Sequence, residues 1–127
     1  MNYSLHTDLY QINMAYSYFN DNVHEDIATF EMFFRHNPFN GGHAVFAGLE
    51  KVIEIIENYH FTNEDIDYLR SEFDYSDEFL EYLLNLKFSG DFYSVREGEV
   101  IFSNEPIIIV KAPLIQAQLL ETVILNV

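Results

Sequence analysis

The segment that most constrains the fold is the last one, residues 114–127. Leucine, isoleucine, valine and alanine occupy nearly every side of it when it is drawn as a helix. A surface helix needs only one apolar stripe, so a helix that is apolar almost all round is expected to be buried on all sides. It also lacks a glycine or basic stop signal, and only Asn126 lies near its end. We therefore expect residues 1–127 to be one domain of a longer protein, with helix 114–127 leading into the next domain.

Before that helix, apolar residues recur with helical spacing in some segments and alternate in others. Thr62 is expected to open one helix as its cap, with Asp65 at the capping-box position. The other predicted elements are helices at about 8–20, 45–59 and 77–86, and strands at 27–35, 91–95, 100–102 and 107–110. This order predicts an α+β fold: a helix-rich domain with a mixed or antiparallel sheet that includes the three late strands. The late strands and the final helix are expected to pack against the absent domain.

The first predicted helix has two apolar faces instead of one. One face carries Leu9, Ile12, Tyr16 and Phe19, and the nearly opposite face carries Tyr10, Met14 and Tyr18. Because one face is enough to bind the core, the second is expected to meet a partner subunit, another domain or a ligand. Tyr10 offers both a stacking plane and a hydroxyl to such a neighbour.

The charge excludes several classes of function. Six Lys and Arg residues stand against 21 Asp and Glu residues, for a formal net charge of −15. So acidic a surface repels nucleic acid and anionic membranes, so neither is an expected partner. The absence of cysteine rules out a disulfide scaffold and a thiolate metal site. No signal peptide or apolar run of ~18 residues is present, and we expect a cytoplasmic protein.

Few residues form a recognisable catalytic or metal-binding pattern. The histidines His6, His24, His36, His43 and His60 have no metal-binding spacing, so we expect no metal site. The turn 40–42 lacks the spacing of a phosphate-binding glycine loop. The acidic pairs 64–65 and 77–78 are explained by helix capping. Glu121 lies among apolar neighbours on its helix, and we expect it to pair with a basic or backbone group of the absent domain.

Arg35 is conspicuous because it is the only Lys or Arg among the first 50 residues. It follows an apolar strand and precedes a glycine-containing loop. A guanidinium there is suited to clamp a phosphate or a carboxylate, and equally to form a salt bridge with one of the many acidic residues. The residues themselves leave these two alternatives open.

Several blocks of the chain, taken together, resemble the N-terminal part of bacterial nicotinate phosphoribosyltransferases. They occur in that family's order over essentially the whole chain and comprise residues 5–11, 30–39, 44–50, 97–100, 104–106 and 113–122. The resemblance implies an N-terminal domain of the kind seen in type II phosphoribosyltransferases, with the barrel domain absent.

The resemblance also implies an activity. The full-length enzyme would transfer phosphoribosyl from phosphoribosyl pyrophosphate to nicotinate, forming nicotinate mononucleotide with ATP hydrolysis, in NAD salvage. ATP and Mg²⁺ are implied for the whole enzyme and neither for this domain alone, which is expected to be inactive with no catalytic residue of its own. A homodimer with an active site shared between subunits is implied as well.

Two substrate-binding residues follow from the resemblance. Tyr10 would stack against the pyridine ring of nicotinate, and Arg35 would approach the phosphates of the donor. Asp8 has no catalytic role assigned to it. The related nicotinamide-using enzymes fit less well, because the blocks around Arg35 match the nicotinate branch better.

A different class of function is also compatible with composition and periodicity. A stand-alone acidic domain could use the same apolar faces to bind a protein partner. The coding sequence beyond Val127 distinguishes the two hypotheses, since a continuation that encodes a barrel supports the enzyme.

Overall fold

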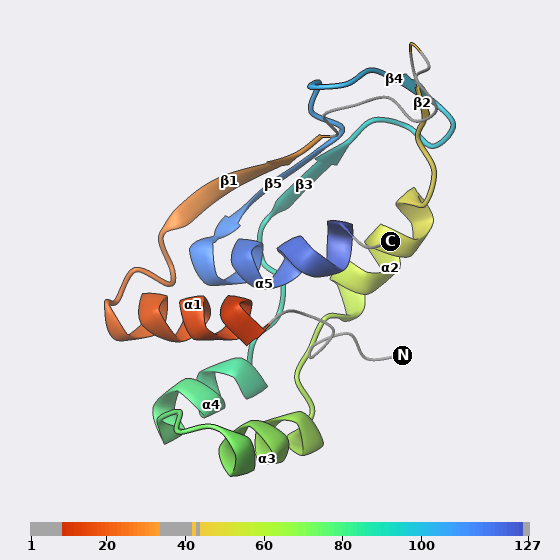
Figure 1. Ribbon diagram of the computed structural model, residues 1–127. Coiled ribbons are helices and arrows are strands. Elements are labelled where there is room, and N and C mark those ends of the chain that lie inside the picture. The colour runs from red at the N-terminus through yellow and green to blue at the C-terminus, as the bar shows by residue number, and fades with distance from the viewer. Residues whose placement is uncertain (1–8, 34–41, 43, 126–127) are drawn as a thin grey trace.

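The computed structural model describes residues 9–33, 42 and 44–125. The elements in chain order are α1 (Leu9–Asn20), β1 (Ile27–Met32), β2 (Ala44–Val45), α2 (Leu49–Asn58), α3 (Asn63–Glu72), α4 (Asp77–Leu84), β3 (Asp91–Ser94), β4 (Val100–Ile101), β5 (Ile108–Pro113) and α5 (Leu114–Leu125). Helix α5 lies along one face of a small sheet, with α1 beside it and α4 and α3 beyond α1 (Figure 1). The predicted α+β class is therefore confirmed.

The larger sheet has three antiparallel strands in the order β1-β5-β3. Its register places Phe30 and Phe92 on either side of Val110. Strand β4 pairs with β2 in a separate two-stranded sheet, so the expectation that all three late strands share one sheet is wrong. Beside β5, Gly90 is required by close packing, because a Cβ atom there would lie 2.4 Å from the Cβ of Ala112.

Helix α5 is buried, as its sequence predicted, and the elements that pack against it belong to this chain. It packs against α1 on one side and against β1 and β5 on another. Its buried residues are Ile115, Gln116, Ala117, Gln118, Leu119, Leu120, Val123 and Ile124. Packing within this chain therefore accounts for most of the burial of this helix, while Leu125 at its end is 57% exposed. That the helix packs against an absent domain stays a prediction.

Helix α2 begins four residues later than the predicted start at Val45. Val45 pairs with Val100 in the two-stranded sheet, and Gly48 adopts a left-handed conformation with φ of 100°. The carboxylate of Glu97 accepts hydrogen bonds from the backbone N–H groups of Gly48 and Leu49, at 3.0 and 2.9 Å. An acidic side chain from a distant turn therefore sets where this helix begins.

The faces of α1 differ partly from the prediction. Ile12 is buried, Tyr16 and Phe19 are half-buried, and both rings pack against Phe79 of α4. Leu9 was assigned to this face but is 50% exposed. On the second face, Tyr10 and Met14 are exposed, as predicted, whereas Tyr18 is half-buried and its hydroxyl donates to Oε1 of Gln118 in this domain.

Candidate functional site

The N-terminal turn of α1 lies against the C-terminal half of α5, since the two helices run side by side in opposite directions (Figure 1). Buried glutamines from both helices meet there: Gln11 has no exposed surface and Gln118 is 5% exposed. Buried amides are costly unless they are hydrogen-bonded, so their partners define the geometry of this region.

The amide of Gln11 is held from both ends. Its Oε1 accepts a hydrogen bond from Nε2 of Gln118. Its Nε2 lies 2.9 Å from the Tyr10 hydroxyl oxygen, 3.2 Å from Oε2 of Glu121 and 3.2 Å from Oγ1 of Thr122. Two N–H groups thus face three oxygen acceptors.

Glu121 has its partners within this chain. Its Oε2 accepts hydrogen bonds from the amides of Gln11 and Gln118, at 3.2 and 3.1 Å. Among the described residues, Lys51 and Arg70 form ion pairs with Glu54, Asp67 and Asp77, and Glu121 takes part in none of these. Glu121 therefore already accepts two hydrogen bonds from neutral amides of this chain, and its pairing with a group of another domain stays a prediction.

A groove of about 190 Å³ opens on the other side of Glu121. Its walls come from β1, β5 and α5 and include Phe30, Met32, Val110 and Ile124. Strand β1 ends at this groove, three residues before Arg35 in the sequence. One end of the domain therefore brings together Tyr10, Glu121 and the strand that leads to Arg35.

Of the predicted site residues, the structure describes Tyr10 and not Arg35. Tyr10 is 52% exposed, and its hydroxyl accepts the hydrogen bond from Gln11. Its ring can therefore be anchored at the hydroxyl while it remains accessible to a flat ligand. Arg35 lies outside the described residues, as do Asp8, His6, His36, His43 and residues 40–41.

The two described histidines do not belong to this region. His24 packs its ring against Phe19 and Tyr82, and its buried Nδ1 has no hydrogen-bond partner. Nδ1 of His60 lies 2.6 Å from the carbonyl oxygen of Asn58. Within residues 9–33, 42 and 44–125, no three His, Asp or Glu side chains gather to hold a metal ion.

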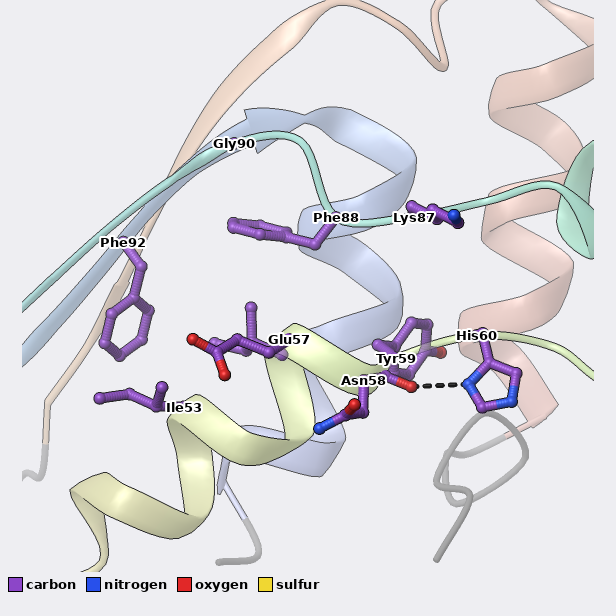
Figure 2. A pocket seen from close by; sticks show the side chains of 10 residues that line it. Ile53, Glu57, Asn58, Tyr59, His60, Lys87, Phe88, Gly90 and Phe92 are labelled. Carbon is purple, nitrogen blue, oxygen red and sulfur yellow. Dashed lines mark hydrogen bonds between the residues drawn. The ribbon is translucent and has the colours of Figure 1, made fainter.

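A larger cavity, about 750 Å³, lies elsewhere, between the end of α2 and the start of β3. Figure 2 shows Phe88, Phe92 and Ile53 around it, with Glu57, His60 and Lys87 also lining it. No residue that the sequence singled out for substrate binding lines this cavity.

Sequence reasoning missed the two buried glutamines at the centre of the candidate site. A signal was present, since Gln116 and Gln118 lie in the first half of a helix whose other residues there are all apolar. Polar residues at such positions require hydrogen-bond partners, and Gln118 donates to Gln11 on the neighbouring helix.

None of the helices in the described part of the chain is long and apolar enough to span a membrane.

Comparison with known proteins gives consistent matches. A family model described as the nicotinate phosphoribosyltransferase (NAPRTase) N-terminal domain matches residues 5–127. A nicotinate phosphoribosyltransferase of Bacillus subtilis is 58% identical over 124 residues, which are 98% of this chain and 25% of that protein. One from Dictyostelium discoideum is 44% identical over 121 residues, 94% of this chain and 20% of that protein.

A solved structure also matches. The crystal structure of human nicotinic acid phosphoribosyltransferase superposes with a TM-score of 0.87 at 35% identity, over 94% of this chain and 25% of that one. The chain therefore spans about a quarter or less of the length of these relatives.

Proposed function

The chain belongs to the nicotinate phosphoribosyltransferase family, whose N-terminal domain it matches, and from this premise we propose that the whole protein makes nicotinate mononucleotide. The pyridine nitrogen of nicotinate attacks C1 of the ribosyl group of phosphoribosyl pyrophosphate. The bond from C1 to the pyrophosphate oxygen breaks, and pyrophosphate leaves with the bonding electrons. The observation that carries this proposal is the family match over residues 5–127, which includes both predicted substrate-binding residues.

In this proposal the domain binds and orients substrates and supplies no reacting group. Tyr10 stacks its exposed ring on the pyridine ring, which fixes the plane from which the nitrogen attacks. Arg35 offers a positive charge to the phosphates of the donor, within a domain that is otherwise strongly acidic.

The remaining parts of the proposal concern the whole protein. It hydrolyses ATP with Mg²⁺, acts in NAD salvage in the cytoplasm, and forms a homodimer in which one subunit's N-terminal domain completes its neighbour's active site. The described residues contain no ligand set for Mg²⁺, so this mechanism assigns no step of the domain to the metal or to ATP.

The test compares Tyr10→Ala with the wild-type full-length enzyme. Loss of a ring pair worth about 0.5–1.5 kcal/mol should raise the KM for nicotinate roughly 2- to 10-fold, while the KM for the phosphoribosyl donor changes little. The complementary variant Arg35→Ala should weaken use of the donor more than use of nicotinate. Steady-state kinetics with each substrate varied in turn measures both.

Tyr93→Ala is the matched control for Tyr10→Ala. Tyr93 is 57% exposed and lies on β3, where its register partner is Ile109, on the sheet face opposite Val110 and α5. Truncation there should leave the KM for nicotinate unchanged. An unchanged KM for Tyr10→Ala as well would remove Tyr10 from the substrate site.

A further inference from the structure

We propose that Gln11 is a positioning residue for Tyr10: its buried amide holds the tyrosine hydroxyl and so fixes the ring that receives nicotinate. This inference rests on the proposed function and extends it from Tyr10 to the residue behind it. The observation that carries it is the hydrogen bond of 2.9 Å from Gln11 Nε2 to the Tyr10 hydroxyl oxygen.

The first step of the argument is that Gln11 is itself immobilised. A glutamine side chain has several rotatable bonds, and ordering it costs up to about 2 kcal/mol of conformational entropy. Here that ordering is already achieved, because Gln11 is fully buried and its Oε1 accepts a hydrogen bond from Gln118. Folding therefore fixes the amide before any ligand arrives.

The second step is that Glu121 sets which end of the amide faces Tyr10. A carboxylate only accepts hydrogen bonds, so the group of Gln11 that lies beside Glu121 must be the nitrogen. That same nitrogen is the group beside the Tyr10 hydroxyl. The contact from Gln118 to Gln11 Oε1 agrees with this orientation. The charge on Glu121 thus keeps an N–H donor pointed at Tyr10.

The third step concerns the ring. Tyr10 is half-exposed in the first turn of α1, where packing alone does not restrict its side chain closely. The hydrogen bond at its hydroxyl tethers the far end of the ring while the exposed surface stays open. A ring that is held in advance loses less entropy when a flat ligand stacks on it, and binding strengthens accordingly.

The experiment is a double-mutant cycle in the full-length enzyme with Gln11→Leu, Tyr10→Phe and the double variant. Each single variant should raise the KM for nicotinate roughly 2- to 10-fold, the loss expected for one hydrogen bond, with the donor KM unchanged. The double variant should lose no more than the larger single effect, because both changes remove the same hydrogen bond. Tyr10→Phe removes the same hydrogen bond by changing the exposed residue, Tyr10, so this variant is expected to fold.

Gln116→Leu is the matched control. Gln116 is a 6% exposed glutamine of α5 whose partners are the backbone N–H and the hydroxyl of Ser89, at 2.9 and 3.1 Å. It should lower thermal stability as Gln11→Leu does, yet leave the KM for nicotinate unchanged.

Two results would overturn the inference: an unchanged nicotinate KM in Tyr10→Phe, or effects of the two single variants that add in the double variant. If either result is obtained while Tyr10→Ala still raises the KM for nicotinate, only the proposed role of Gln11 is contradicted. An unchanged KM in Tyr10→Ala means that the substrate-binding proposal itself fails.

Discussion

At the scale of single residues, three tyrosine hydroxyls lie where ionisation is unfavourable. Burial, and secondly the negative charge of Asp65, raise the pKa of Tyr59 far above its usual value of 10.0. Burial also raises the pKa of Tyr82, helped by its hydrogen bond to Glu25. Burial raises the pKa of Tyr75 in the same direction. In the folded domain these hydroxyls therefore stay protonated to higher pH than a free tyrosine does.

This gives a pH dependence of stability. In the unfolded chain a tyrosine ionises near its usual pKa of about 10, whereas folded Tyr59 stays protonated. Between those two pKa values the unfolded state binds fewer protons, so the free energy of unfolding falls as pH rises. The fall is at most about 1.4 kcal/mol per pH unit for each such group. Below about pH 10 this stabilisation is fully present.

Tyr59→Phe tests the prediction. Urea unfolding at a series of pH values should show a shallower loss of stability in the variant above about pH 10 than in the wild type. Tyr93→Phe, at an exposed tyrosine of β3, should keep the wild-type slope. Identical slopes for wild type and Tyr59→Phe would contradict the assignment.

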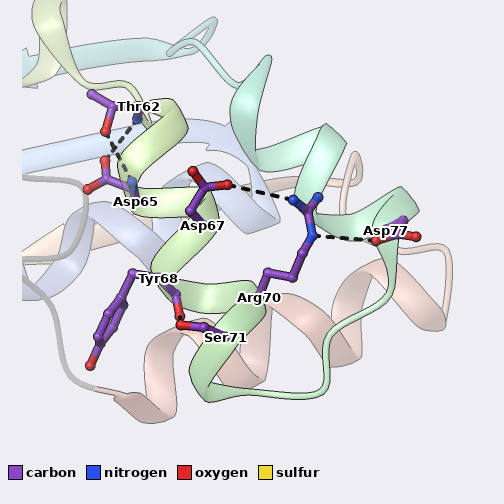
Figure 3. Close-up of polar contacts among 7 residues, drawn as sticks. All are labelled: Thr62, Asp65, Asp67, Tyr68, Arg70, Ser71 and Asp77. Carbon is purple, nitrogen blue, oxygen red and sulfur yellow. Dashed lines mark hydrogen bonds and ion pairs between the residues drawn. The ribbon is translucent and has the colours of Figure 1, made fainter.

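At the scale of elements, α3 begins with a reciprocal pair of hydrogen bonds. Thr62 Oγ1 accepts from the backbone N–H of Asp65 at 3.2 Å, and the backbone N–H of Thr62 donates to Asp65 Oδ2 at 2.8 Å (Figure 3). The sequence predicted this capping box from the spacing of the two residues, and it is confirmed.

Thr62→Ala should therefore lower the free energy of unfolding by about 1 kcal/mol, because a backbone N–H at the helix start loses its acceptor. Ser71→Ala on the same helix is the control. The Ser71 hydroxyl donates to the carbonyl oxygen of Tyr68 at 3.0 Å in an exposed position (Figure 3), so its loss should cost less than about 0.5 kcal/mol. Equal losses in the two variants, measured by urea unfolding, would argue against the cap.

At the scale of the whole molecule, the charge opposes folding. The net charge is −15. Lys51 and Arg70, which form ion pairs in the described part of the chain, are themselves exposed. Exposed pairs contribute little, so they do not offset the mutual repulsion of the carboxylates.

Salt should therefore stabilise this domain. Raising sodium chloride from about 0.05 M to about 0.5 M shortens the range of the repulsion to a few ångströms and should raise the melting temperature. Potassium chloride serves as the control and should act equally, because screening does not depend on which monovalent cation is present. A melting temperature that falls with either salt would show that favourable ion pairs outweigh the repulsion.

Local signals determined much of the fold in advance. Capping residues and apolar periodicity placed α1 and α4 within about two residues and the start of α3 at its cap, because these signals act between neighbours in the chain. Strand patterns located β1, β3, β4 and β5, but β5 runs to Pro113 instead of 110, and β2 was not predicted. The exposed second face of α1, with Tyr10 on it, was also predictable, since it follows from counting apolar faces.

Contacts between distant residues decided the rest. The start of α2 depends on Glu97, which lies almost fifty residues away in the sequence. Strand β4 pairs with β2, which lies more than fifty residues before it, and neither strand's own sequence specifies that partner. Part of the packing on α5, and one of the two amide partners of Glu121, also come from α1, at the other end of the sequence. The amino-acid sequence by itself therefore determined which segments are helical or extended and which residue types are available. Only the tertiary structure decided that Gln11 lies between Glu121 and Tyr10, because hydrogen bonds between remote side chains leave no periodic trace in the chain.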